Sequence, residues 1–182
     1  VTLPSTLETL GERVFAKCTG LTSIVIPEGV TSMGSYAFYG CTHLVSASLP
    51  STLETWGQDV FMNCTDLTTL MISEGVTSIG TTAFWGCSSL TSVSLPSTLK
   101  TLEYGAFLSC TSLTSVVIPE GVASIDGSVF GRCTSLISVS LPSTLKTLGY
   151  YVFNNCTSLT SIVIPEGVTS MGSHAFYECT SL

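Results

Sequence analysis

Eight cysteines are the most reactive side chains of this 182-residue sequence, because a thiol can form a disulfide, hold zinc or act as a nucleophile. They recur at a constant interval of 23 residues, as Cys18, Cys41, Cys64, Cys87, Cys110, Cys133, Cys156 and Cys179. No Cys-x-x-Cys pair is present, so the spacing offers no zinc site. Units stacked at ~4.8 Å would hold neighbouring Cβ atoms farther apart than the ~3.8 Å of a disulfide. We therefore predict a buried column of reduced thiols.

The two histidines, His43 and His174, are the candidate general bases. In a stack of units they would lie roughly 27 Å apart, so they cannot share an active site. The repetition places no serine or carboxylate beside either histidine to complete a triad. The sequence therefore predicts a protein that is not an enzyme, with no catalytic residue, no cofactor and no metal.

Four glutamates recur every 46 residues, at Glu28, Glu74, Glu120 and Glu166, and predict an acidic row along one corner. A two-unit spacing of ~9.6 Å is too wide for several carboxylates to surround one calcium ion. We interpret the row as solvation of the turn, and weak divalent binding between rows is the alternative.

Aromatic side chains near the phenylalanine of each unit form the candidate contact surface. Its members are Tyr36, Tyr39, Trp85, Tyr151 and Tyr177. The outward strand positions are mainly serine and threonine, and they lack the Trp, Tyr and Arg that usually anchor a binding surface. We interpret the aromatics as a partly exposed ladder that contacts sugar rings or a protein. Packing over the turn is the alternative.

Two Asn-Cys-Thr triplets, beginning at Asn63 and Asn155, match the acceptor pattern for N-linked glycans. The match is weak, because the Cys-Thr of the repeat creates it wherever Asn precedes. Both asparagines fall at the same position of their units, so we expect them on one face as possible glycosylation sites.

Composition narrows the class of protein. Apolar residues make up 45% of the chain, which is enough to fill a core. The net charge is −7, and only five residues are Lys or Arg, so nucleic acid and anionic membrane surfaces are unsuitable partners. The longest apolar runs are four residues, such as residues 150–153, far short of the ~20 that span a membrane.

The period of the cysteines is shared by all eight phenylalanines, each three residues before a cysteine. They are Phe15, Phe38, Phe61, Phe84, Phe107, Phe130, Phe153 and Phe176. A fixed period of roughly 20 to 50 residues is typical of a solenoid, in which each unit buries its apolar side chains only against its neighbours. We predict that the phenylalanines and cysteines form core ladders in one domain, residues 1–182, with eight 23-residue repeats.

Each unit also shows its local elements. In residues 21–26 apolar and polar positions alternate, which predicts a strand that pairs in parallel with the next unit. Pro27 and Gly29 predict a tight corner. The segment 35–39 is too short for an ordinary helix, and we expect one helical turn that carries Phe38 into the core. Alternate units are the most similar, so the larger module has 46 residues.

The unit LxxLxLPxxLxxIxxxxFxxC closely resembles the BspA-like, or Treponema-type, leucine-rich repeat over the whole of residues 1–182. The departures are local: Ser73 replaces proline, and Glu103 and Asp126 replace glycine. The resemblance implies an α/β-type leucine-rich-repeat solenoid, right-handed and curved. A parallel β-sheet would form one face, and short helical turns and loops the other. It also implies a large surface or secreted protein of bacteria or anaerobic protists, with relatives associated with adhesion.

The functional expectation follows from this architecture. We expect a non-enzymatic, cell-surface or secreted adhesion module, extracellular in location, with a protein or glycan ligand. The alternative is a structural block that stacks head-to-tail with copies of itself into a filament or surface layer. Two added residues would continue the repeat in register across the junction, so we also expect a segment of a longer array.

We predict that none of the cysteines forms a disulfide. Titration of the denatured protein should return eight free groups, because the repeat gives no pair the geometry of a disulfide. Four or fewer free thiols would show that neighbouring cysteines are bridged.

Overall fold

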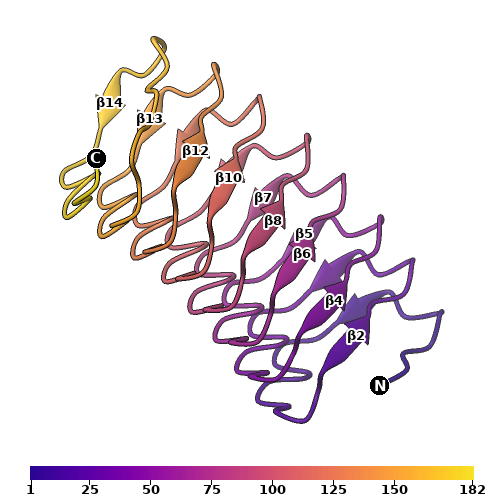
Figure 1. Cartoon of the computed structure of the whole chain (residues 1–182). Helices are drawn as coiled ribbons and strands as arrows, with labels where there is room; N and C mark the ends of the chain where they lie inside the picture. The colour runs from indigo at the N-terminus through magenta and orange to yellow at the C-terminus, as the bar shows by residue number, and fades with distance from the viewer.

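The computed structural model describes residues 1–182 as one stack of similar coils, with the termini at opposite ends of the stack (Figure 1). It is a parallel β-solenoid of about seven turns, with repeats of about 23 residues. The expected number of eight full repeats is therefore wrong. Each cysteine marks one corner of a coil, so eight cysteines do not require eight complete coils. The first unit starts within its strand segment, and the last stops three residues after Cys179.

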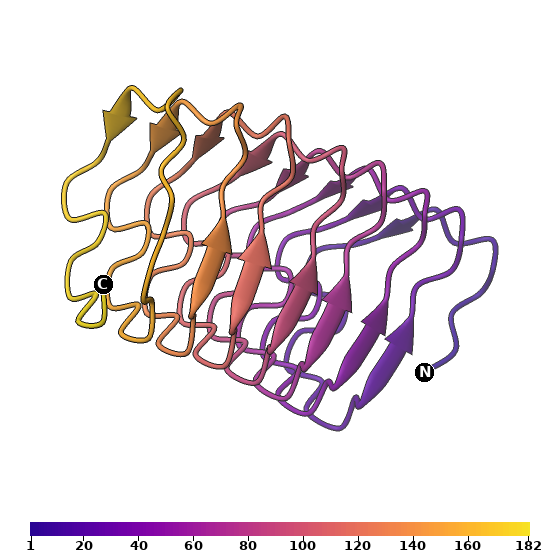
Figure 2. The ribbon, with the colours of Figure 1, turned by 45° about the horizontal axis from the view of Figure 1, so that its top comes forward.

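Three-residue strands line one side of the coil, the sheet face (Figure 2). They are β2 (Ser23–Val25), β4 (Ser46–Ser48), β6 (Thr69–Met71), β8 (Ser92–Ser94), β10 (Ser115–Val117) and β12 (Ser138–Ser140). They pair in parallel only two by two, as β2–β4, β6–β8 and β10–β12. Each pair joins a unit with a Glu-Gly corner to the Leu-Pro-Ser-Thr unit that follows, so the module of this face is the 46-residue pair.

Two-residue strands line a second side. They are β1 (Thr9–Leu10), β3 (Ser32–Met33), β5 (Thr55–Trp56), β7 (Ser78–Ile79), β9 (Thr101–Leu102), β11 (Ser124–Ile125), β13 (Thr147–Leu148) and β14 (Ser170–Met171). They form two parallel sheets, β1-β3-β5 and β14-β13-β11-β9-β7. From β1 to β13 the second residue of each strand is buried and the first faces outward, because side chains alternate along a strand.

The break between β5 and β7 coincides with Trp56, which stands where the other units have Leu, Ile or Met. Its indole Nε1–H donates to the Ser78 carbonyl at 2.7 Å. Its ring lies edge-on to Phe84, with centroids 5.6 Å apart. At this boundary a side-chain hydrogen bond therefore stands in place of the strand pairing found at the other boundaries of this side.

The third side, which we call the turn face, consists of residues 11–18 and their equivalents and contains no helix. The predicted helical turn at 35–39 is therefore wrong. The physical reason is the backbone angle: Tyr36 has φ of 60°, and equivalent residues throughout the chain share this left-handed conformation, which interrupts a right-handed helix. Hydrogen bonds run between units instead of along a helix, as from Tyr36 N to Gln58 O at 2.9 Å.

The phenylalanines stack along the axis of the solenoid. Neighbouring ring centroids lie 5.1–5.6 Å apart and the ring planes differ by 2–15°. The rings without exposed surface are those of Phe38, Phe61, Phe84, Phe107, Phe130 and Phe153. Phe15 and Phe176, at the two ends of the stack, are half-buried. The hydrophobic core is thus one continuous column instead of a central globule.

Replacement of Phe130 by alanine should destabilise the protein by about 3–5 kcal/mol, because the ring is fully buried between two stacked neighbours. Urea unfolding measures this change in the free energy of unfolding. Val117→Ala is the matched control: that side chain is 68% exposed on the sheet face, so its loss should change stability by less than about 0.5 kcal/mol. A cost for Phe130→Ala below about 1 kcal/mol would contradict its place in the column.

Candidate functional site

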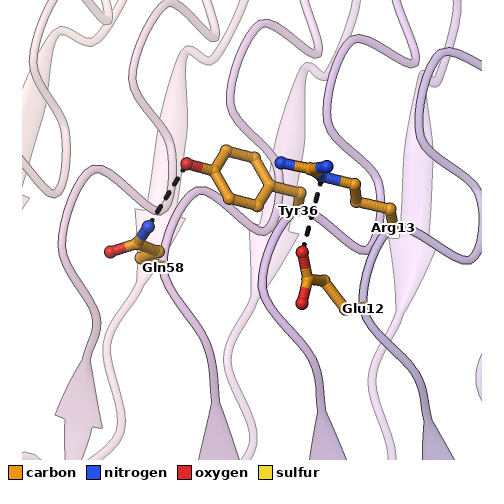
Figure 3. A network of polar contacts seen from close by, with 4 residues as sticks. All are labelled: Glu12, Arg13, Tyr36 and Gln58. Atoms are coloured by element: carbon orange, nitrogen blue, oxygen red, sulfur yellow. Dashed lines mark hydrogen bonds and ion pairs between the residues drawn. The ribbon is translucent and has the colours of Figure 1, made fainter.

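The turn face collects most of the candidate aromatics into two separate clusters. The N-terminal cluster consists of Glu12, Arg13, Lys17, Tyr36, Tyr39 and Gln58, four of which are drawn in Figure 3. The C-terminal cluster consists of Tyr104, Tyr150, Tyr151, Asn155, His174, Tyr177 and Glu178. Six units separate the equivalent residues Tyr36 and His174, a distance of about 29 Å along the stack.

In the N-terminal cluster, two cations lie against two tyrosine rings. The guanidinium carbon of Arg13 is 4.9 Å from the Tyr36 ring centroid, and Lys17 Nζ is 5.9 Å from that of Tyr39. The two rings meet edge to face, with centroids 5.9 Å apart. Gln58 Nε2 donates to the Tyr36 hydroxyl at 3.2 Å. These contacts orient both rings and hold positive charge beside them.

The backbone holds these side chains in place. Arg13, Lys17 and Tyr36 all have positive φ, between 56° and 60°. Such angles are uncommon for side chains larger than glycine, asparagine or aspartate. The hydrogen bond from Arg13 N to Ser35 O, at 3.0 Å, fixes the first of these residues to the next unit. The cluster is therefore carried by a rigid frame and not by a free loop.

The N-terminal cluster encloses a hollow of about 440 Å³, lined by Arg13, Ala16, Lys17, Tyr36 and Tyr39. Binding sites for small ligands have volumes of roughly 300–1,000 Å³, so a small molecule or the end of a larger chain fits this space. The only ion pair of the chain, from Arg13 Nε to Glu12 Oε1 at 3.5 Å, involves one of these lining residues (Figure 3).

In the C-terminal cluster, a histidine takes the place of the cations. The His174 ring stacks on Tyr151 with centroids 4.8 Å apart and meets Tyr177 edge to face at 5.5 Å. The side chain of Asn155 donates to Glu178 Oε2 at 2.8 Å. A hydrogen bond between Tyr177 and Glu178 raises the pKa of the Tyr177 hydroxyl. This cluster is aromatic like the first, but it carries a carboxylate and no lysine or arginine.

Trp85 belongs to neither cluster. Its side chain is 39% exposed on the turn face between them. The five candidate aromatics thus lie as Tyr36 and Tyr39 in one cluster, Tyr151 and Tyr177 in the other, and Trp85 between them. The sequence analysis did not identify Arg13, Lys17 and His174 as members of these clusters. When the units are aligned at the 23-residue period, each of the three falls at the same position in the unit as a candidate residue or next to one.

The glutamates of the acidic row bind the following unit. Glu28 Oε2 accepts hydrogen bonds from Ser51 N at 3.0 Å and from Ser51 Oγ at 2.9 Å. Glu74 and Glu120 make the same contacts with the serines one unit ahead, and hydrogen bonds from the serine backbone and side chain lower the pKa of both carboxyls. The row therefore fastens neighbouring corners together, beyond the solvation we expected. No group of three His, Cys, Asp or Glu side chains that could hold a metal ion is assembled.

Asn63 and Asn155, the possible glycan acceptors, lie on the turn face and are partly exposed. Both have positive φ, at 59° and 60°. Each side chain is in contact within the fold: Asn155 donates to Glu178, and Asn63 Oδ1 lies against Gly86. Glycosylation of the two residues stays a prediction.

All eight cysteines are free thiols. Six of them are buried: Cys41, Cys64, Cys87, Cys110, Cys133 and Cys156. Their Sγ–H groups donate to the phenylalanine carbonyls of the preceding unit at 3.0–3.3 Å, as from Cys133 to Phe107. Burial raises the pKa of Cys41 to about 11, and those of Cys87 and Cys133 to about 12. A thiol that stays protonated is a poor nucleophile, and these six side chains pack in the hydrophobic core.

Comparison with known proteins places this architecture. A family model described as the BspA type leucine rich repeat region matches residues 1–111 and 57–182, with six copies. The T. pallidum leucine-rich repeat protein TpLRR is 31% identical, with a TM-score of 0.82; the match covers 87% of this chain and 77% of that one. No match was found among curated protein sequences.

Two further solved structures are similar. A leucine-rich repeat protein from Eubacterium ventriosum is 32% identical, with a TM-score of 0.79; the match covers 86% of this chain and 42% of that one. A leucine-rich repeat protein from Bacteroides ovatus is 28% identical, with a TM-score of 0.70 and coverage of 96% and 57%. The chain therefore spans about half the length of these two relatives. The secondary structure consists of short strands, and no membrane-spanning helix is found.

The raised thiol pKa values predict a loss of stability at alkaline pH. Above pH 9.0, the ordinary value, thiols of the unfolded chain ionise, while those of the folded chain stay protonated until about pH 11 to 12. The stabilisation is complete below pH 9 and is lost as the pH rises, by about 1.4 kcal/mol per pH unit for each buried thiol.

Urea unfolding under reducing conditions between pH 7 and pH 10 checks this expectation. Cys133→Val removes one buried thiol and should reduce the total loss of stability between pH 7 and pH 10 by about 1.4 kcal/mol, most of it above pH 9. Equal slopes for this variant and the wild type would contradict the assignment of the effect to the thiols.

Proposed function

The chain belongs to the BspA-type leucine-rich repeat family, and on that premise we propose that it is a non-enzymatic binding and adhesion module. Leucine-rich repeat proteins generally bind proteins, and the family and fold are generally non-enzymatic. The observation that carries the proposal is the gathering of tyrosines into two clusters on one rigid face. Tyrosine is among the residues that dominate binding energy at interfaces.

The turn face is a better contact surface than the sheet face. Exposed apolar residues of the sheet face, Val25, Met71, Val117 and Val163, stand singly, one every 46 residues, among serines and threonines. The sheet face offers no aromatic anchor. On the turn face, by contrast, large rings contact one another and remain open to solvent, so a ligand can cover several at once.

Rigidity supports the same choice. Tyr36 N donates to Gln58 O at 2.9 Å, and Tyr151 N to Ser173 O at 3.0 Å, so the backbone of each cluster is tied to the next unit. A ligand that binds such a frame does not have to order a loop, which lowers the entropic cost of association. A protein or glycan on an exposed surface fits this description, and we extend the proposal to a secreted or cell-surface location.

Binding to a glycan array and to a panel of purified matrix proteins tests the proposal. Tyr36→Leu/Tyr39→Leu or Tyr151→Leu/Tyr177→Leu should weaken capture of a specific ligand at least about tenfold, a loss of about 1.4 kcal/mol. The matched control, Val117→Ser/Val163→Ser, alters the sheet face and should leave capture unchanged. Loss of capture in the control alone would move the binding surface to the sheet face.

Head-to-tail stacking into a filament is the second candidate function. It is favoured by the common direction of the hydrogen bonds on the turn face. Its N–H groups donate toward the following unit, from Arg13 to Ser35 and from Tyr36 to Gln58. Two solenoids in line would thus present donors to acceptors. Electron microscopy of concentrated protein distinguishes the candidates, since long fibres with a ~4.8 Å repeat favour stacking and uniform short particles exclude it.

A further inference from the structure

The N-terminal cluster concentrates positive charge in a strongly acidic protein. The chain has a net charge of −7 and five Lys and Arg residues in total. Two of these, Arg13 and Lys17, line the same hollow of about 440 Å³. The other three, Lys100, Arg132 and Lys146, belong to three different units. An anionic group therefore finds adjacent cations at this one place on the surface.

Arg13 is available to a ligand. Its contact with Glu12 joins only Nε to one carboxylate oxygen, at 3.5 Å, and both side chains are more than 60% exposed. An exposed ion pair of this kind contributes at most about 1 kcal/mol, so it competes weakly with an incoming carboxylate. The guanidinium also lies over the Tyr36 ring, 4.9 Å from its centroid, and a carboxylate can accept two parallel bonds from its nitrogens beside that ring.

The rings beside these cations suit a sugar. The C–H groups of a sugar ring pack on aromatic side chains, and Tyr36 and Tyr39 both line the hollow and are partly exposed. Gln58 donates to the Tyr36 hydroxyl, so the hydroxyl proton remains free to bond a sugar oxygen. The volume of the hollow, about 440 Å³, lies within the range of sites for small ligands, so it fits the end of a glycan.

The local charge of the cluster limits the kind of anion that it balances. Arg13 and Lys17 line the hollow and Glu12 lies beside Arg13, so these three side chains carry one net positive charge, which a carboxylate with a single charge neutralises. We propose that the N-terminal cluster binds a sugar that carries a carboxylate, such as a terminal sialic or uronic acid of a glycan. The inference rests on the proposed binding function and names the ligand class for one of its two clusters.

The C-terminal cluster has similar aromatic residues but no lysine or arginine, so the two clusters can be compared as binding sites for an acidic sugar. Tyr151, His174 and Tyr177 occupy the same columns as the aromatic residues of the N-terminal cluster. The column of Lys17 holds Glu178 there, and no arginine or lysine is present in the cluster. An acidic sugar should therefore choose the N-terminal cluster, where aromatic and cationic groups coincide.

Titration of the full chain with sialyllactose, followed by NMR, tests the proposal, with lactose as the neutral probe. Saturable shifts at Arg13, Tyr36 and Tyr39 are expected with sialyllactose and not with lactose. Arg13→Gln/Lys17→Gln should weaken binding at least about tenfold, because both charge partners of the carboxylate are lost. Glu12→Gln should strengthen it about two- to threefold by removing the competing carboxylate.

The controls are Arg132→Gln, which removes one distant cation, and Tyr151→Leu, which alters the other cluster; neither should change the affinity for sialyllactose. Unchanged affinity in Arg13→Gln/Lys17→Gln would overturn the proposal, as would equal binding of lactose or inorganic phosphate. If sialyllactose fails while capture on the arrays still depends on Tyr151 and Tyr177, the acidic-sugar assignment is wrong and the binding function stands. If the turn-face tyrosines matter in neither experiment, both are wrong.

Discussion

No coil of this chain can satisfy its own backbone or bury its own side chains. On the turn face, amide groups donate to the next coil, as Phe38 N does to Val60 O at 2.8 Å. In the core each phenylalanine ring finds its partner about one coil away, at 5.1–5.6 Å. Even the corner glutamates bind the serine of the following unit. Stability is therefore the sum of contacts between neighbours, and the surface of each side is a regular set of columns.

The period alone predicts most of this architecture. Recurring phenylalanine and cysteine at 23 residues can be buried together only by stacking, which fixes the solenoid and its core. The turn face could not be predicted in the same way. The short segment 35–39 suggests a helical turn, but residue type does not reveal that Tyr36 itself adopts a left-handed φ of 60°. Cross-unit hydrogen bonds compensate for that conformation, and they exist only once the units are stacked.

The sequence proposes the candidate site by residue type, and the arrangement of those residues comes from the structure. The tyrosines were identified because aromatics of this kind anchor interfaces, and the structure places four of the five candidates in two clusters. The tyrosines fall into two clusters according to which positions of the unit carry large side chains in adjacent units. This pattern is visible only when the units are aligned. The same alignment places Arg13 beside Tyr36, so the positive charge of the N-terminal cluster could be predicted from the sequence.

One boundary between coils lacks strand pairing, which affects how the solenoid responds to force. β4 does not pair with β6 and β5 does not pair with β7, so strand pairing is absent on both strand sides between the same two units. The turn face still crosses this boundary, for example through Phe61 N and Ala83 O at 2.8 Å. A pulling force along the axis would meet least resistance here. A solenoid under tension would therefore open at this joint before the coils on either side unravel.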